Sequence, residues 1–437
     1  MLGNLARMLV LAAAISGLCA PVQANTTAVI GAAVGTAENA SASAGSSLPG
    51  IHAQRSVLDN LQLAQTDLAL PRDENDDLSN GPIIEAVEMP VVVSRLPPVR
   101  IALLLPRRSE SLAQVADAVR SGFMAAYQYE PANITVNLVE TGDSAQDVLS
   151  GYLDAAMRND IVVGPLTRSG ANAIAQNGNV TKPTIALTQL DTADGTETRV
   201  PTNMLVMGLS IEDEARQIAD WLGARKAGIK AFAISTNVSW QRRAVKAFST
   251  EWRHLGLQSE TMELGMTGSF INATALVQLK KRIQAEKPAL IFVGLDAAQT
   301  IQLRLAIGGE VPLVGTSQLN PLALADWAGA DKLPDLEGVR LLDMPWQLQA
   351  DHTAVMAYPH LTKTGEQRIS PDIERLYALG VDAYRVAHNI AIKQNEFKLD
   401  GVTGKLAIRF GQGAPHFDRL MQPAIYRDGV VQPMEIP

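Results

Sequence analysis

Residues 99–140 read VRIALLLPRRSESLAQVADAVRSGFMAAYQYEPANITVNLVE, a sequence that places a strand, a helix and a second strand in succession. The apolar run Val99–Leu105 has the length of a strand and stops at Pro106. Residues 112–127 then carry apolar side chains at a helical period, and residues 134–139 alternate as a strand does. A strand–helix–strand unit of this kind predicts two parallel strands in one sheet.

The same alternation of strands and helices fills residues 99–187 and resumes over residues 204–314. Strands that alternate with helices predict parallel sheets covered by helices on both faces. We therefore expect an α/β fold with two doubly wound parallel-sheet lobes, one in each segment, between which the chain crosses several times. A strand at residues 339–342 and a long helix at residues 371–392 come after both sets, and we expect these C-terminal elements to return to the first lobe.

The first residues predict an export signal. Arg7 precedes an apolar run over residues 8–18, and Val22-Gln23-Ala24 offers a cleavage site with small residues at its outer positions. The run is shorter than the roughly 20 apolar residues that span a bilayer. A buried core helix is the alternative interpretation. The position and flanks of the run favour a signal peptide over residues 1–24 and a periplasmic mature chain.

Cys19, the one cysteine of the sequence, lies inside this signal. Acylation of a lipoprotein requires a small residue directly before the cysteine, whereas Leu18 stands there. Cys19 is therefore a weak candidate for lipidation, and we expect a membrane association only if it is acylated. Cleavage after Ala24 would leave a mature chain without cysteine, which suits an oxidising compartment and excludes disulfides and thiol chemistry.

Residues 25–97 predict a flexible linker of low complexity that contains no domain of its own. Residues 25–50 are rich in Ala, Ser, Thr and Gly, a composition typical of flexible tethers. An amphipathic stretch at residues 57–68 allows one short docking helix before the acidic residues 73–77. The remaining residues, 98–437, are expected to form the two-lobed domain.

The composition and the absence of catalytic motifs argue against an enzyme or a nucleic-acid binder. Apolar residues make up 47% of the chain and the net charge is -8, so the chain can bury large cores but offers no basic surface. The sequence holds no HExxH, GxSxG or SxxK motif and no phosphate-binding glycine loop. On the long helix, Asp382 is expected to be structural and His388 to face solvent. We expect no catalysis, metal or cofactor.

A ligand cleft is the one candidate site in the sequence. Ligands of open α/β sheets bind beyond the carboxyl ends of the strands, where the strand order reverses. Hydroxyl, amide and backbone N–H groups at these ends could hold a small polar or carboxylate group. The same residue types also cap helices and form turns, so each residue alone fits that ordinary role as well. The candidates that follow predicted strands are Ser109, Gly164, Pro165, Leu166, Thr167, Thr188, Gln189, Thr316 and Ser317.

Several short stretches of the segment from Val99 onward carry a family resemblance. In order they are VRSGFMAAY (119–127), VGPL (163–166), IALTQ (185–189), LEGV (336–339), DMPW (343–346), LYALGVDAY (376–384), DGVTGKL (400–406) and AIYRDG (424–429). In its fold the segment resembles the type I periplasmic binding proteins. More closely, it is similar to the C-terminal domain of the penicillin-binding protein activator family, the LppC/LpoA lipoproteins. Well-known members of that family are outer-membrane lipoproteins. Because Leu18 precedes Cys19, we favour this location less for the present chain.

The resemblance implies a regulator that acts by contact. A family member would dock on a class A (bifunctional) penicillin-binding protein and favour its active state in peptidoglycan synthesis. Such an effect requires only a difference in affinity for two states of the enzyme, and no catalytic residues. The alternative is a solute-binding receptor of an ABC transporter, which would hold an amino acid or a similar small polar ligand between the lobes.

Overall fold

The computed structural model describes residues 97–191, 200–223, 227–324, 332–361, 369–411 and 413–435. The predicted signal peptide, Cys19 and all but the last residue of the predicted linker lie outside these residues. Of the helices in the described part of the chain, none combines the length and the apolar character that a membrane span requires.

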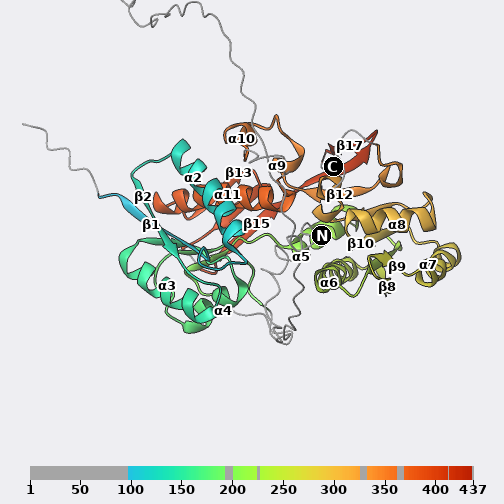
Figure 1. Ribbon diagram of the computed structural model, residues 1–437, viewed down its shortest axis with the longest axis horizontal. Coiled ribbons are helices and arrows are strands. Elements are labelled where there is room, and N and C mark those ends of the chain that lie inside the picture. Colours follow the sequence, from blue (N-terminus) through green and yellow to red (C-terminus); the bar gives the residue numbers. More distant parts are fainter. Residues whose placement is uncertain are drawn as a thin grey trace, which may run out of the picture. The chain divides into compact units, whose positions relative to one another are not determined.

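Lobe 1 is built on a parallel sheet with the strand order β2-β1-β3-β4-β5. Helices cover both of its faces because successive side chains of a strand point to opposite sides. Along β1, Ile101 and Leu103 pack in the same cluster as α2 and α11, whereas Ala102 and Leu104 pack with α3 and α4 (Figure 1). The strands are β1 (Val99–Leu105), β2 (Ile134–Glu140), β3 (Ile161–Val163), β4 (Thr184–Ala186) and β5 (Met204–Val206), and the helices are α2 (Ala113–Tyr129), α3 (Ala145–Arg158), α4 (Arg168–Asn177) and α11 (Pro371–Ala391).

Lobe 2 is built on a sheet with the order β17-β16-β12-β11-β10-β6-β7, in which β16 and β17 run antiparallel to their neighbours. Phe292 of β10 packs with α6 on one face, and Ile291 packs with the α7 and α8 side of the sheet. The strands are β6 (Lys230–Ser235), β7 (Gln258–Glu263), β10 (Leu290–Val293), β11 (Leu313–Gly315), β12 (Arg340–Asp343), β16 (Gln422–Arg427) and β17 (Val430–Pro433). The helices are α5 (Ile211–Gly223), α6 (Ser239–His254), α7 (Ala273–Glu286) and α8 (Ala297–Ile307), and a small hairpin is formed by β8 (Met266–Thr267) and β9 (Phe270–Ile271).

The expected fold class, two α/β lobes with parallel sheets and chain crossings, is confirmed. Two elements lie in another lobe than the sequence suggested. The strand at 204–206 pairs with β4 of lobe 1, where Thr184 lies opposite Met204, because the chain crosses to lobe 2 only after this strand. The strand at 340–343 belongs to lobe 2, where it pairs with β11. The helix α11 returns to lobe 1 as predicted, whereas β16 and β17, which the sequence did not predict, join the sheet of lobe 2.

A further antiparallel sheet, β13-β14-β15, was not predicted. It consists of β13 (Glu396–Asp400), β14 (Lys405–Arg409) and β15 (His416–Leu420). Leu406 and Ile408 of β14 point into the core that the two lobes share. Between β11 and α11 lie the short helices η1 (Ser317–Leu319), η2 (Pro321–Ala323), η3 (Pro334–Leu336), α9 (Pro345–Leu348) and α10 (Thr353–Met356).

The helices α2 and α11 cross at two glycines. A Cβ atom on Gly122 would lie 1.9 Å from the carbonyl oxygen of Tyr377, and one on Gly380 would lie 2.1 Å from that of Val119. The absence of side chains at both positions therefore lets the two backbones touch. Next to this crossing, Tyr384 of α11 packs edge-on against Phe123 of α2, with ring centroids 5.2 Å apart.

Candidate functional site

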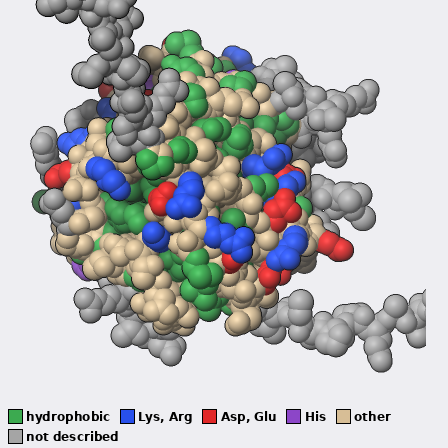
Figure 2. Space-filling view, turned by 90° about the vertical axis from the view of Figure 1, so that its left-hand side faces the viewer, with side chains coloured by type: hydrophobic (Ala, Val, Ile, Leu, Met, Phe, Trp, Pro, Cys, Tyr) green, Lys and Arg blue, Asp and Glu red, His purple; other side chains and the backbone are tan. Residues whose placement is uncertain are grey.

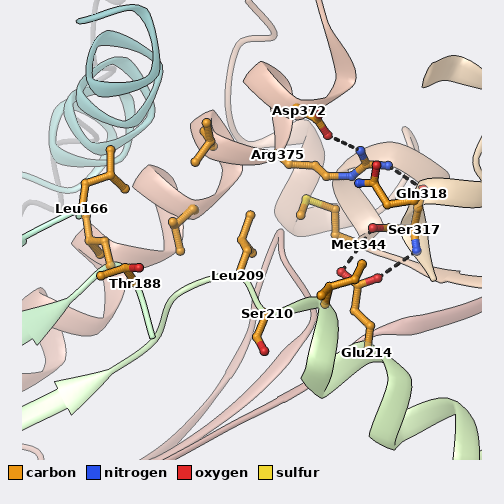
Figure 3. A pocket seen from close by; sticks show the side chains of 14 residues that line it. Leu166, Thr188, Leu209, Ser210, Glu214, Ser317, Gln318, Met344, Asp372 and Arg375 are labelled. Carbon is orange, nitrogen blue, oxygen red and sulfur yellow. Dashed lines mark hydrogen bonds and ion pairs between the residues drawn. The ribbon is translucent and has the colours of Figure 1, made fainter. Parts of the chain in front are cut away.

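A pocket of about 150 Å³ lies between the two lobes (Figure 3). Its apolar side includes Leu166 and Leu187 of lobe 1 and Leu376 and Leu379 of α11. Its polar side includes Glu214 of α5, Ser317 of η1 and Arg375 of α11. Figure 3 shows Leu209 between Leu166 and Thr188 on one side and the Glu214 and Arg375 side chains on the other. The volume is about half the lower end of the range usual for small-molecule sites, about 300 Å³.

Three of the predicted cleft residues, Leu166, Thr188 and Ser317, line this pocket. Leu166 and Thr188 follow β3 and β4 of lobe 1, and Ser317 follows β11 of lobe 2, so carboxyl ends of strands from both sheets lie at the pocket. The other six candidates are not among the residues that line it: Ser109, Gly164, Pro165, Thr167, Gln189 and Thr316.

Three of these six residues use their side chains in structural hydrogen bonds. The Ser109 hydroxyl donates to Asp143 Oδ2 at 2.7 Å, and the Thr167 hydroxyl accepts from the backbone N–H of Gly170 at the start of α4. The Gln189 amide donates to Asp213 Oδ2 at 3.3 Å. Thr316 is fully buried, and no protein partner reaches its hydroxyl within the described residues.

Gly164 has a positive φ of 117° and precedes Pro165 across a cis peptide bond. A Cβ on Gly164 would lie 2.2 Å from the carbonyl oxygen of Leu104, so only glycine fits at this position. The VGPL turn thus shapes the backbone that carries Leu166 into the pocket.

A cluster of buried charges on the polar side of the pocket was not predicted. The Arg375 guanidinium donates from Nη1 to Asp372 Oδ1 at 2.9 Å (Figure 3). It also donates from Nη2 to Asp343 Oδ2 at 2.7 Å and to the Ser317 carbonyl at 3.1 Å. Asp343 is fully buried and also accepts from the Asn320 amide and from the Met344 N–H, both at 2.9 Å. Because α11 packs on lobe 1 and Asp343 ends β12 of lobe 2, Arg375 joins the two lobes.

Glu214 and Asp372 are the acids of this cluster that line the pocket, and Glu214 is the one that does not pair with Arg375. Its carboxylate accepts from the Ser317 N–H at 2.8 Å and from the Ser317 hydroxyl at 3.2 Å. Loss of hydration on burial raises the pKa of Glu214 to about 7, against the opposite effect of the Ser317 hydrogen bonds, and the charge of Asp343 adds to the rise. The carboxyl group can therefore gain or lose its proton near neutral pH.

The sequence does carry a signal for these residues, because both charges stand on apolar helix faces. Glu214 shares the helical spacing of the buried Ala215 and Ile218 on α5. Arg375 shares that of Leu379 and Ala383 on α11. Lys, Arg, Asp and Glu are rarely fully buried unless they have a partner, so a charge within an apolar stripe indicates a buried ion pair or a site.

Of the two predictions made for Asp382 and His388, which also lie on α11, one agrees with the structure and one does not. The Asp382 carboxylate accepts from the N–H groups of Val402 and Thr403 at 3.2 and 2.8 Å, which is the structural role that we expected. The solvent-facing position expected for His388 is wrong, because its side chain is buried. His388 lies on the side of α11 that α2 covers, with its Nε2 3.8 Å from Glu130 Oε1.

A second pocket, of about 360 Å³, lies between α5 and β15. Arg419 of β15 lines this pocket and donates to the Met207 and Gly208 carbonyls at 2.8 and 3.0 Å and to the Thr403 hydroxyl at 3.0 Å. These bonds fasten the β13-β14-β15 sheet to the segment that carries the chain from lobe 1 to lobe 2. In the described ranges, no three His, Cys, Asp or Glu side chains gather in a way that would hold a metal ion.

Comparison with protein families gives one match, to the family described as "LppC putative lipoprotein", over residues 85–287 and 293–429. No curated protein matches the chain significantly.

Solved structures share the fold. A structure of a putative branched-chain amino acid ABC transporter from Chromobacterium violaceum ATCC 12472 is 30% identical, with a TM-score of 0.58, over 75% of this chain and 100% of that one. The C-domain of LpoA from Haemophilus influenzae, described as a regulator of PBP1A, is 18% identical, with a TM-score of 0.58, over 77% of this chain and 100% of that domain. Full-length LpoA from the same organism is 18% identical, with a TM-score of 0.59, and 77% of this chain spans 59% of its length.

Proposed function

The chain belongs to the LppC family, and we propose that it is a non-catalytic periplasmic regulator that contacts and activates a class A penicillin-binding protein during peptidoglycan synthesis. The family match over most of the chain carries this proposal. The structures of Haemophilus influenzae LpoA support it through their shared fold and through the description of one of them as a regulator of PBP1A.

The geometry of the site fits regulation by contact better than solute transport. The inter-lobe pocket is small, and the chain's own Arg375 and Glu214 occupy its polar side. The outer surface carries side chains that a protein partner can contact. Figure 2 shows apolar side chains among interleaved basic and acidic ones on one face of the molecule. Interfaces between proteins that also exist apart are about as apolar as an ordinary protein surface, so this composition is compatible with a protein contact.

Location and attachment follow from the same proposal. Residues 1–24 would direct export, residues 25–97 would form a linker, and residues 98–437 would form the regulatory module. Cys19 remains a weak candidate for acylation, so we favour a soluble periplasmic protein over an outer-membrane lipoprotein. Mass spectrometry of the mature N-terminus separates the two, because a chain that starts at Asn25 lacks Cys19.

The experiment is a binding and activity assay with each class A penicillin-binding protein of the source bacterium. The purified protein is expected to be captured by at least one of these enzymes and to raise the peptide cross-linking that it produces. A solute-binding protein of the same fold serves as the control and is expected to change nothing. If no such enzyme binds the protein or responds to it, the proposal is wrong.

A second candidate function is a solute receptor of an ABC transporter, which the similarity to the Chromobacterium violaceum structure favours. A receptor for branched-chain amino acids would be stabilised against heat by leucine, isoleucine or valine, because a ligand that binds only the folded state raises the unfolding temperature. Stabilisation by these amino acids without any effect on cross-linking would select this second function.

A further inference from the structure

Glu214 is a buried carboxylate without a cationic partner. Its side chain lines the inter-lobe pocket and is 7% exposed. Within the described part of the chain, no Lys, Arg or His nitrogen lies within ion-pair distance of it; only Ser317 donates to it. Buried charges in proteins are normally paired, because removal of a lone charge from water is costly. When it is ionised, Glu214 therefore has no cation in direct contact, and the charges of Arg375 and Arg419 act on it only from beyond ion-pair distance.

The surrounding charges increase this imbalance. Three carboxylates, those of Glu214, Asp343 and Asp372, surround the one guanidinium of Arg375. All three nitrogens of Arg375 already donate, to Asp343, Asp372 and the Ser317 carbonyl. Arg375 thus has little capacity left to receive an anion. It pairs directly with the two aspartates, and its charge reaches Glu214 only from a longer distance.

The other residues of the pocket indicate the size and the apolar character of a ligand that would fit it. Leu166, Leu187, Leu209 and Leu379 form an apolar wall opposite Glu214. A cavity of about 150 Å³ with apolar walls accommodates a molecule the size of benzene, which has six carbon atoms. An apolar body of about that size would therefore fit while a polar head lies at the carboxylate.

We propose that this pocket binds a small ligand that has an ammonium head and an apolar body and lacks a carboxylate. The ammonium group donates to Glu214, which has acceptor positions free beyond the two that Ser317 uses. The apolar body lies against the leucines. A carboxylate on the ligand would meet the negative charges of Glu214 and Asp372, so an amino acid is excluded and its decarboxylated amine is accepted.

Four probes of similar apolar shape test this in calorimetric titrations of the complete protein: 3-methylbutylamine, 3-methylbutan-1-ol, leucine and 4-methylpentanoate. The amine is expected to bind saturably. The neutral alcohol, which keeps the shape and loses the charge, is expected to bind about tenfold more weakly or not at all. Leucine and 4-methylpentanoate are expected not to bind. Binding of leucine or 4-methylpentanoate as tight as that of the amine overturns the proposal, and so does absence of amine binding.

The variant Glu214→Gln keeps the shape of the side chain and an acceptor for Ser317 and removes the charge. It is expected to weaken amine binding about tenfold or more. Glu212→Gln, which removes a charge two residues earlier on α5 where Glu212 pairs with Arg243, is the matched control and is expected to bind as the parent does. Equal binding by both variants would contradict the role of Glu214.

The pH dependence gives a second readout that does not require a variant to fold. The amine stays protonated from about pH 6 to pH 8, whereas Glu214 ionises in this range. Affinity for 3-methylbutylamine is therefore expected to rise about tenfold between these pH values, in proportion to the ionised fraction of Glu214. Affinity that does not change with pH would contradict the proposal. None of these outcomes depends on whether the protein activates a penicillin-binding protein.

Discussion

Single residues explain why the stretches that carry the family resemblance have their composition. Gly122 of VRSGFMAAY and Gly380 of LYALGVDAY are the two points at which the α2 and α11 backbones touch. Asp343 of DMPW holds Arg375, and Asp382 of GVDAY holds the turn of DGVTG. The stretches are far apart in the sequence, but the two glycines, Asp343 and Asp382 all lie on α11 or contact it.

Gly380→Ala is expected to lower the free energy of unfolding by about 1–3 kcal/mol or more, because the added Cβ would lie 2.1 Å from the Val119 carbonyl oxygen and force the helices apart. Urea unfolding followed by circular dichroism measures the change. Gly309→Ala is the control, since a Cβ there meets nothing within 4 Å. Its effect is expected to stay within about 1 kcal/mol. Equal stability of the two variants would show that the crossing tolerates a side chain.

Glu214 makes the stability depend on pH. Its pKa of about 7 in the folded protein exceeds the ordinary value of 4.5, so the folded state holds the proton more strongly than the unfolded state. This contribution is complete below about pH 4.5 and is lost as the pH rises through about 7, a decrease of about 3 kcal/mol. Urea unfolding at pH 5 to 8 is expected to show a decrease that Glu214→Gln removes. A parallel decrease in both proteins would assign it to other groups.

The candidate site was only partly predictable at this scale. Leu166, Thr188 and Ser317 follow from a general rule about strand ends, which needs only the positions of the strands. Glu214 and Arg375 both form hydrogen bonds with Ser317, from which they are 103 and 58 residues away in the chain. No local pattern gives that pairing, because it depends on how the lobes close over α5 and α11.

At the scale of elements, local periodicity predicts where the strands and helices of the parallel sheets lie. It does not predict which sheet a strand joins. Ser144, which directly precedes α3, caps this helix, with its hydroxyl accepting from the Asp147 N–H. The strand β5 was assigned to the wrong lobe because it directly precedes the helix that begins lobe 2. The alternation in EFKLD, KLAIR and HFDRL indicates half-buried strands, but their packing against the shared core is a long-range property.

α11 holds the β13-β14 turn through Asp382. This carboxylate is fully buried and accepts from Val402 N–H, Thr403 N–H and the Thr403 hydroxyl. Asp382→Asn would turn an NH₂ group toward one of these donors and remove the charge, so we expect a loss of about 1–3 kcal/mol in unfolding free energy.

Hydrogen exchange provides the measurement that distinguishes this role. Exchange of the Val402 and Thr403 amides is expected to accelerate in Asp382→Asn beyond the global change in stability. Asp154→Asn on α3, which removes only an exposed pair with Arg158, is the control and is expected to cost at most about 1 kcal/mol. Uniform acceleration over the whole chain would mean that Asp382 does not act on the turn in particular.

At the scale of the whole molecule, one apolar cluster extends from lobe 1 into lobe 2, and polar links are added where the chain crosses. Arg419 fastens the C-terminal sheet to the segment after β5, and Arg375 fastens α11 to the end of β12. An open solute receptor needs lobes that can move apart. A contact regulator needs a surface of fixed shape, which such links favour.

The Arg375–Asp343 pair is expected to be the main polar link between the lobes. Arg375→Met would leave Asp343 buried without its cation and should lower the free energy of unfolding by about 3–5 kcal/mol. Because Asp343→Asn removes the charge that is left unpaired, the double variant should be more stable than the sum of the single changes predicts, by about 1–3 kcal/mol. The exposed Arg158–Asp154 pair, treated in the same way, should couple by less than about 1 kcal/mol.

Small-angle scattering should show a larger radius of gyration for Arg375→Met under native conditions, since the lobes lose this link. A coupling no greater than that of the exposed pair, together with unchanged scattering, would mean that the apolar cluster alone holds the lobes together.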